Sequence, residues 1–399
     1  MPFGTRNLSI LFFALVVVML GFGMIIPILP FYIDAFGASG SALGLLMATF
    51  ATMQFIFAPL WGRLSDRIGR KPVLIIGLLG NALSMLLFGL STRLWMLYVF
   101  RGLSGVLSSA TMPSAMAYVG DSTSEKQRGG GMGLMGAAMG LGMVLGPGLG
   151  GWLGNQSLAR PFFLATGLSL LAAFFVLLVL PESLQPENRN QRSQQASGSR
   201  FNKLWLALRG PLGILFVLAF LISFGLTNFE SVFGLYALER FGYGPQRVGT
   251  ILTFIGLTSA VIQGGLAGPL TRRFGEVPII RFCLFGSAIG FVLMLLAYDF
   301  ITVVITSSLF VMSNALLRPG ISALISLRSP TGQGIAMGLN NSFMSLGRIA
   351  GPIFAGLLFD ANLNLPYLAG SLVMLLGLLV SLVWLQKQAL PNQTTQKSV

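Results

Sequence analysis

The sequence predicts an all-α integral membrane protein with twelve transmembrane helices in two pseudo-symmetric six-helix halves. First, 54% of the 399 residues are hydrophobic and 9% are charged, with a mean hydropathy of +0.81, whereas soluble domains carry about 25% charged residues. Second, apolar stretches of the roughly 20 residues that a helix needs to cross a bilayer recur twelve times. Third, two segments 206 residues apart repeat each other, and many transporters are built from repeated bundles.

The predicted spans are joined by short loops, with one exception. They cover residues 9–30, 42–61, 72–92, 94–118, 130–154, 161–181, 211–236, 247–268, 277–297, 299–322, 333–357 and 365–385. The exception, 182–210, is polar and rich in Gln and Arg, which predicts a solvated linker between an N-terminal half, 1–181, and a C-terminal half, 211–399. A regulatory or partner-binding segment is the alternative for this linker.

The internal repeat extends beyond one loop. Gly62–Lys71 reappears in degraded form as Gly268–Glu276. At an offset of 205 residues, Gly142 matches Gly347 and Gly146-Pro147 matches Gly351-Pro352. Two matches at nearly the same offset indicate a duplicated bundle with a central site between its halves.

The basic residues indicate membrane topology rather than nucleic-acid binding, despite a net charge of +14. If both termini lie on one side, 18 Lys and Arg fall on that side and 4 on the other, with Arg281 and Arg247 near span ends counted with the side they face, and the other 3 lie inside spans. Basic residues accumulate in cytoplasmic loops. We therefore expect a multi-pass membrane protein with both termini in the cytoplasm and no nucleic-acid partner.

Enzymatic, metal and cofactor chemistry are not expected. Cys283 is the single cysteine and the chain has no histidine, which excludes disulfides and the usual zinc and haem ligand sets. The first apolar segment is long, carries Pro27 and Pro30 and lacks a small-residue cleavage site. It is expected to be a retained helix rather than a signal peptide.

The loop between the second and third spans is a candidate conformational latch. Asp66 stands alone among basic residues and is flanked by two glycines; the predicted latch residues are Gly62, Asp66, Arg67, Gly69 and Arg70. A carboxylate there can pair with a base or with the N-terminus of a neighbouring helix, whose partial charge is positive. Such a contact would hold one half against the other and open when the halves rock. The alternative is a basic cluster that only sets topology.

The fifth span is unusually rich in glycine. Gly142, Gly146, Gly150 and Gly151 remove side chains from the helix surface, and Pro147 removes a backbone donor. Such a helix can pack closely and bend. Generic packing of small residues is the alternative.

These motifs carry a family resemblance. The pattern Gly62-x-Leu64-x-Asp66-Arg67-x-Gly69-Arg70-Lys71 resembles the signature loop of the major facilitator superfamily, and the twelve-span, two-half layout over the whole chain is similar to that family's. The fifth span resembles the antiporter motif of the superfamily's drug exporters. Leu20–Pro30 is similar to the first-helix pattern of its twelve-span drug:proton antiporters.

Two charged residues inside spans are candidates for proton coupling. Glu230 is the only acidic residue well inside a span, and desolvation there favours a carboxyl group that exchanges protons or meets a cationic substrate. A structural carboxylate, paired to Arg318 or hydrogen-bonded to Asn228, is its alternative. Arg101 lies within the fourth span; the resemblance implies a part in proton transfer, and snorkelling to the outer end of the span is its alternative.

The resemblance implies export of drugs in exchange for protons, by a monomer in the inner or plasma membrane of a bacterial cell. The predicted substrate cavity is greasy and adaptable, and its residues are Met24, Phe50, Gln54, Met112, Phe229, Phe233, Asn340 and Phe343. Tetracycline specialists carry acids in the first and third spans, but this chain has none there, which favours lipophilic, often cationic drugs such as quinolones and dyes. A tetracycline-specific antiporter stays open, as does, in another class, an importer or a non-transporting membrane sensor.

Overall fold

The computed structural model describes residues 5–184, 200–210, 212–329 and 332–384. These residues are helical and contain no strand. The helices of the first part are α1 Thr5–Ile25, α2 Leu29–Ala35, α3 Gly40–Ile68, α4 Arg70–Gly89, α5 Leu94–Ser108, α6 Thr111–Ser122, α7 Glu125–Gly154 and α8 Arg160–Val179. After the linker helix α9, Arg200–Arg209, come α10 Gly213–Phe241, α11 Pro245–Val261, the π-turn Ile262–Leu266, α12 Ala267–Phe274, α13 Glu276–Leu295, α14 Phe300–Arg328, α15 Gln333–Ala361 and α16 Leu365–Trp384.

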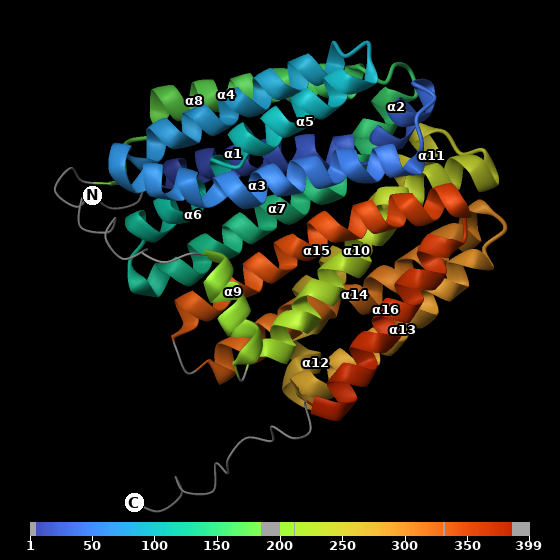
Figure 1. Cartoon of the computed structure of the whole chain (residues 1–399). Coiled ribbons are helices and arrows are strands. Elements are labelled where there is room, and N and C mark those ends of the chain that lie inside the picture. Colours follow the sequence, from blue (N-terminus) through green and yellow to red (C-terminus); the bar gives the residue numbers. More distant parts are fainter. Residues whose placement is uncertain (1–4, 185–199, 211, 330–331, 385–399) are drawn as a thin grey trace, which may run out of the picture.

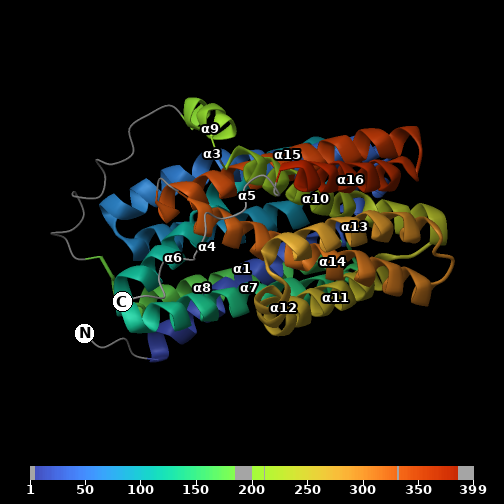
Figure 2. The same ribbon diagram turned by 90° about the horizontal axis from the view of Figure 1, so that it is seen from below.

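The helices form two groups that meet at one end (Figure 1). In the first group α1 packs on α7 and α8, and α4 on α8 and α5; in the second α10 packs on α15 and α16, and α13 on α14 and α16. The groups touch mainly where α3 meets α15 and α7 meets α11. We call the end that carries Arg67, Arg70 and Arg272 the basic end, and the end where α3 begins the opposite end. Figure 1 shows the groups diverging towards the basic end, and Figure 2 shows the same helices from below, with α9 at the edge of the bundle.

Eleven of the twelve predicted spans are confirmed as helices long and apolar enough to cross a membrane. The fourth, predicted as one helix over 94–118, is instead broken at Ser109 and Ala110 into α5 and α6. Pro113 has no N–H to donate to the carbonyl of Ser109, four residues earlier, so the helix is interrupted there. The first span is likewise interrupted by a turn at 26–28, which contains Pro27.

The predicted linker 182–210 is only partly described, since 185–199 lie outside the described residues. The parts of this segment that the structure describes are not purely solvated, unlike the predicted linker. Glu182 binds backbone groups of α4, as shown below, and Arg200–Arg209 forms α9. In α9 Trp205 and Leu206 are exposed while Leu204 is buried.

Glycines on α7 allow its backbone to approach two helices at once. A Cβ on Gly146 would lie 2.8 Å from Cα of Gly23, so α1 and α7 are in backbone contact on one face. On another face, a Cβ on Gly151 would lie 2.9 Å from Cα of Gly249 in α11, which belongs to the other group. The glycine-rich fifth span thus packs within its own group and across to the other group.

The internal repeat produces the same kind of glycine packing where α3 meets α15. A Cβ on Gly44 would overlap the carbonyl oxygen of Pro352, and a Cβ on Gly249 would overlap that of Pro147. Gly44 and Gly249 are 205 residues apart, as are Pro147 and Pro352. The two contacts between the groups are therefore pseudo-symmetric copies of one glycine-to-carbonyl packing.

We expect Gly146→Ala to lower the free energy of unfolding by about 1–3 kcal/mol, the usual effect of overpacking. Its methyl group would meet the backbone of α1, which cannot move aside as a flexible side chain would. Gly140→Ala on the same helix is the control, because a Cβ there meets nothing within 4 Å. Thermal unfolding of both variants in detergent checks this, and equal melting temperatures would contradict it.

Candidate functional site

Glu230 lies in the middle of α10, half-buried. Arg318 of α14 and Arg348 of α15 act on it electrostatically, and α10 packs against both of these helices. Neither arginine makes a direct ion pair with Glu230 within the described residues. The carboxyl group is therefore within electrostatic range of two cationic side chains of its own group, with no direct ion pair to either among the described residues.

The structural alternatives for Glu230 do not match this arrangement. The Nδ2 atom of Asn228 donates to the carbonyl oxygen of Pro366 at 2.9 Å, so this amide joins α10 to α16. Asn228 is 1% exposed. Its amide nitrogen is thus committed away from Glu230.

Arg101 lies inside the first group and does not snorkel. Its side chain is 2% exposed, and its guanidinium carbon stands 4.5 Å from the centre of the Phe50 ring. Its Nε atom has no hydrogen-bond partner, and no carboxylate pairs with it in the part of the chain that the structure describes. A cation over an aromatic face gains about 2 kcal/mol or more when desolvated. Phe50, predicted as a cavity residue, here supports Arg101.

At the basic end, Arg70 joins three helices of the first group. It is 3% exposed, and it pairs with Asp66 of α3 at 2.6 Å and with Asp121 of α6 at 2.9 Å. It also donates to the hydroxyl of Ser65 at 3.3 Å. Asp121 was not anticipated from the sequence, because its contact with Arg70 spans 51 residues and an irregular helix break.

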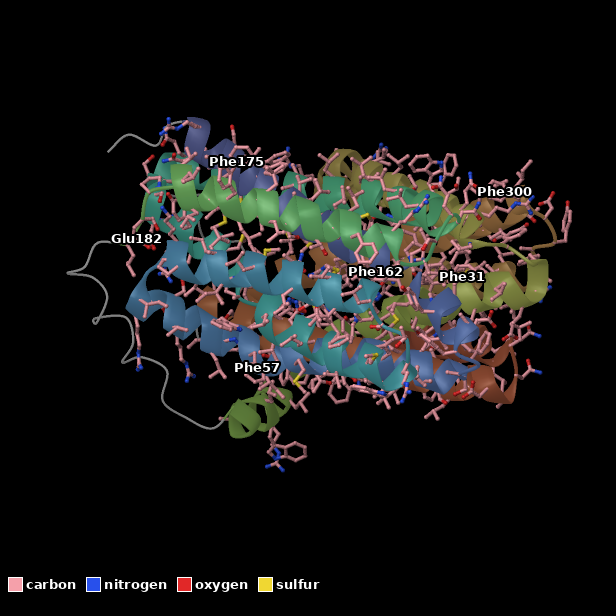
Figure 3. The ribbon with its side chains drawn as sticks, turned by 90° about the horizontal axis from the view of Figure 1, so that it is seen from above. Phe31, Phe57, Phe162, Phe175, Glu182 and Phe300 are labelled. Atoms are coloured by element: carbon pink, nitrogen blue, oxygen red, sulfur yellow. The ribbon has the colours of Figure 1, made fainter. Side chains whose placement is uncertain are left out.

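Glu182 binds the beginning of α4. Its carboxylate accepts hydrogen bonds from the backbone N–H groups of Arg70 at 2.9 Å and Lys71 at 3.1 Å. Gly69 makes this approach possible, since its φ is 113° and a Cβ there would meet the carboxylate. Figure 3 shows Glu182 at this end of the molecule. The sequence places Glu182 in the polar linker and indicates no role for it, because its contact with Arg70 spans 112 residues.

The predicted latch residues thus lie together, and the contacts seen for Gly62, Asp66, Gly69 and Arg70 are made within the first group. Asp66 pairs with Arg70 rather than with the second group. Gly62 packs near Pro113, and the side chain of Arg67 is exposed. In this conformation the two groups diverge towards the basic end (Figure 1), and a latch contact between them at Asp66 stays a prediction.

Most predicted cavity residues are buried in this conformation. Met24, Phe229, Phe233 and Asn340 are each 1% exposed. Phe229 packs on Phe310 and Phe343 stacks on Phe216, both within the second group. Gln54 and Met112 are half-buried.

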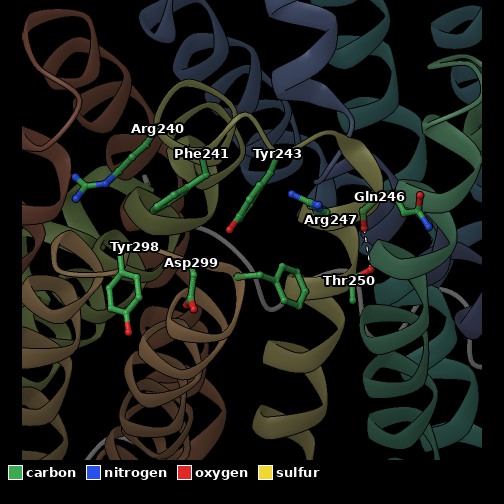
Figure 4. Close-up of a pocket in the computed structure, with 9 residues that line it drawn as sticks. Arg240, Phe241, Tyr243, Gln246, Arg247, Thr250, Tyr298 and Asp299 are labelled. Atoms are coloured by element: carbon green, nitrogen blue, oxygen red, sulfur yellow. Dashed lines mark hydrogen bonds between the residues drawn. The ribbon is translucent and has the colours of Figure 1, made fainter.

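A groove of about 850 Å³ lies at the opposite end, between α10, α11 and α14 (Figure 4). Arg240 and Arg247 flank it, and Asp299 caps α14 beside it. Hydrogen bonds from the Thr302 hydroxyl and backbone N–H lower the pKa of Asp299. The groove belongs to the second group alone and does not contain Glu230.

The model of the Major Facilitator Superfamily matches residues 11–267 and 215–398. The chain belongs to this superfamily. It is 38% identical to Multidrug resistance protein 2 of Bacillus subtilis over 93% of both chains. It is 29% identical to Quinolone resistance protein NorA of Staphylococcus aureus, over 96% of this chain and 98% of that one.

Solved structures agree with this assignment. The crystal structure of the human organic anion transporter MFSD10 (TETRAN) has a TM-score of 0.69 and 25% identity, covering 94% of this chain and 99% of that one. The predicted membership and the all-α membrane fold are therefore confirmed, and the protein is a transporter rather than an enzyme.

We expect Arg70→Met to lower the free energy of unfolding of this superfamily member by about 2 kcal/mol. Removing one partner of a fully buried pair costs about 3–5 kcal/mol, and this is reduced because the Asp66 and Asp121 side chains are 28% and 12% exposed. Lys71→Met is the control, since the Lys71 side chain forms no ion pair among the described residues. Melting in detergent checks this, and equal destabilisation by both changes would contradict it.

Proposed function

We propose that this protein is a proton-coupled antiporter that exports lipophilic, often cationic drugs by alternating access. The observation that carries the proposal is similarity along nearly the whole chain to proteins named for multidrug and quinolone resistance. The half-buried Glu230 supplies a single carboxyl group at mid-membrane depth that can hold either a proton or a cationic drug.

The proposed orientation has the basic end in the cytoplasm. It follows from the excess of Lys and Arg on that side, 18 against 4. The described conformation, with the halves in contact at the opposite end, is then the state that receives drug from the cytoplasm. The protein acts as a monomer with small-molecule drugs and protons as its partners, and the halves are 1–181 and 211–399, joined by 182–210.

Proton exchange at Glu230 would proceed by competition. When the carboxyl group is ionised, it can attract a cationic drug against the repulsion of Arg318 and Arg348. When a proton binds from outside, the negative charge disappears and the drug loses that attraction.

A tetracycline-specific antiporter is the second candidate, but the first and third spans contain no acid. An importer or a sensor has no specific observation in its favour. A dye and antibiotic efflux assay in a transporter-depleted bacterial host tests the proposal. Export of dyes and quinolones is expected, while export of tetracycline alone would favour the second candidate and no export would refute both.

We expect Glu230→Gln to lower proton-driven dye efflux at least tenfold, because the amide keeps the size of the side chain but cannot release a proton. Glu239→Gln, at the exposed end of the same helix, is the control and should retain efflux. Efflux driven by an imposed pH gradient in reconstituted vesicles measures both. Full activity of Glu230→Gln would remove Glu230 from the coupling step.

We also expect exchange of a monovalent cationic drug to be electroneutral. With one carboxyl group, one proton enters for each cation that leaves, so a membrane potential worth about 2.3 kcal/mol per charge per 100 mV does no work. In vesicles with a fixed pH gradient, collapsing the potential with valinomycin and potassium should leave dye uptake unchanged. A strong loss of uptake would mean more than one proton per cation.

A further inference from the structure

The two groups are joined at the opposite end by a carboxylate, in addition to their glycine packing. Asp360, near the end of α15, accepts a hydrogen bond from the backbone N–H of Gly40 at 2.6 Å and one from Ser41 at 3.0 Å. These are the first two residues of α3, in the other group. The contact therefore joins residues about 320 positions apart across the interface.

The carboxylate of Asp360 accepts hydrogen bonds from backbone N–H groups at the start of α3 that have no partner within the helix. The first N–H groups of any helix have no partner within the helix. The Ser39 hydroxyl accepts from Ala42 at 3.4 Å, which leaves Gly40 and Ser41 to Asp360. A carboxylate at this point is also favoured by the positive end of the helix dipole. The second group thus provides a helix cap for the first.

Close packing positions the cap. A Cβ on Gly40 would lie 2.8 Å from the Phe359 ring and 3.0 Å from the Asp360 carboxylate, so only glycine fits. A Cβ on Gly356, one turn earlier on α15, would overlap the Gly40 carbonyl oxygen. The backbones of α3 and α15 must be this close for both hydrogen bonds to form, and any separation at this end breaks them.

The pseudo-symmetric interface cannot form the same pair of bonds to a carboxylate. The residues 205 positions away from Asp360 and Gly40 are Asn155 and Pro245. Asn155 carries no charge, and Pro245, the first residue of α11, has no N–H to donate. The charged cap is therefore present at one of the two crossings.

We propose that Asp360 is a positioning residue of the transport cycle: its contact with the start of α3 stabilises the conformation that is closed at the opposite end and open at the basic end. This rests on the proposed function only in supposing that the halves alternate. When the opposite end opens, Gly40 and Ser41 lose the carboxylate and the helix dipole loses its counter-charge. Asp360 thus acts at one end of α3 as the predicted latch at Asp66 would act at the other.

The experiment measures conformation rather than transport. Spin labels on Ser124→Cys and Phe274→Cys, exposed at the basic ends of the two groups, report their separation by double electron–electron resonance, with Cys283→Ser as background. We expect Asp360→Ala to increase the ratio of the short-distance to the long-distance population about tenfold, as the loss of a good helix cap implies. Asp360→Asn keeps one acceptor and should give a smaller increase.

Asp299→Ala is the matched control. Asp299 is an exposed acid at the same end, and its carboxylate caps α14 within its own group rather than across the interface. It should leave both populations unchanged. Unchanged populations in Asp360→Ala, or an equal change in Asp299→Ala, would overturn the proposal. Because labels report distance without any drug, a failed efflux assay would refute the proposed function and leave this result independent.

Discussion

The close approach of helix backbones at glycine is the constraint on which the rest of the structure depends. In a membrane the lipid tails are as apolar as the side chains, so helices associate through close packing rather than through burial of apolar surface. Gly146 brings α7 against α1, while Gly151 of the same helix meets α11 of the other half. Since one helix makes both contacts, a shift between the halves is transmitted directly to the packing within a half.

This arrangement explains how the halves can separate at one end without dissociating. The contacts between the halves involve two pseudo-symmetric crossings, α3 with α15 and α7 with α11, both near the opposite end. Glycine surfaces offer no interlocking side chains and allow the helices to tilt on each other. The charged groups that must lose contact during such a tilt, such as Asp360, then have a large effect on which end is open.

The charged residues inside the bundle are of two kinds, those with a fixed partner and one without. Arg101 is held over Phe50, and Arg70 is held by two carboxylates, so each has a fixed position within the first half. Glu230, by contrast, is half-buried in the second half. Arg318 and Arg348 act on it electrostatically, but it makes no direct ion pair among the described residues. A fixed pair stabilises one arrangement, whereas a carboxyl group without a fixed partner can bind and release a proton or a cation.

The sequence by itself determined the membrane character, eleven of the twelve predicted spans, the duplication and the superfamily, because these depend on composition, periodicity and local motifs. It also placed Asp66 and Arg70 in one loop, where their pairing is a contact between residues four apart on consecutive helices. Only the tertiary structure decided that Pro113 interrupts the fourth span, that Glu182 and Asp121 converge on the start of α4, and that Asp360 caps α3. Those contacts join segments that are far apart in the sequence and that meet only because the glycine-rich helices cross. A local sequence pattern does not specify which residues lie side by side at such a crossing.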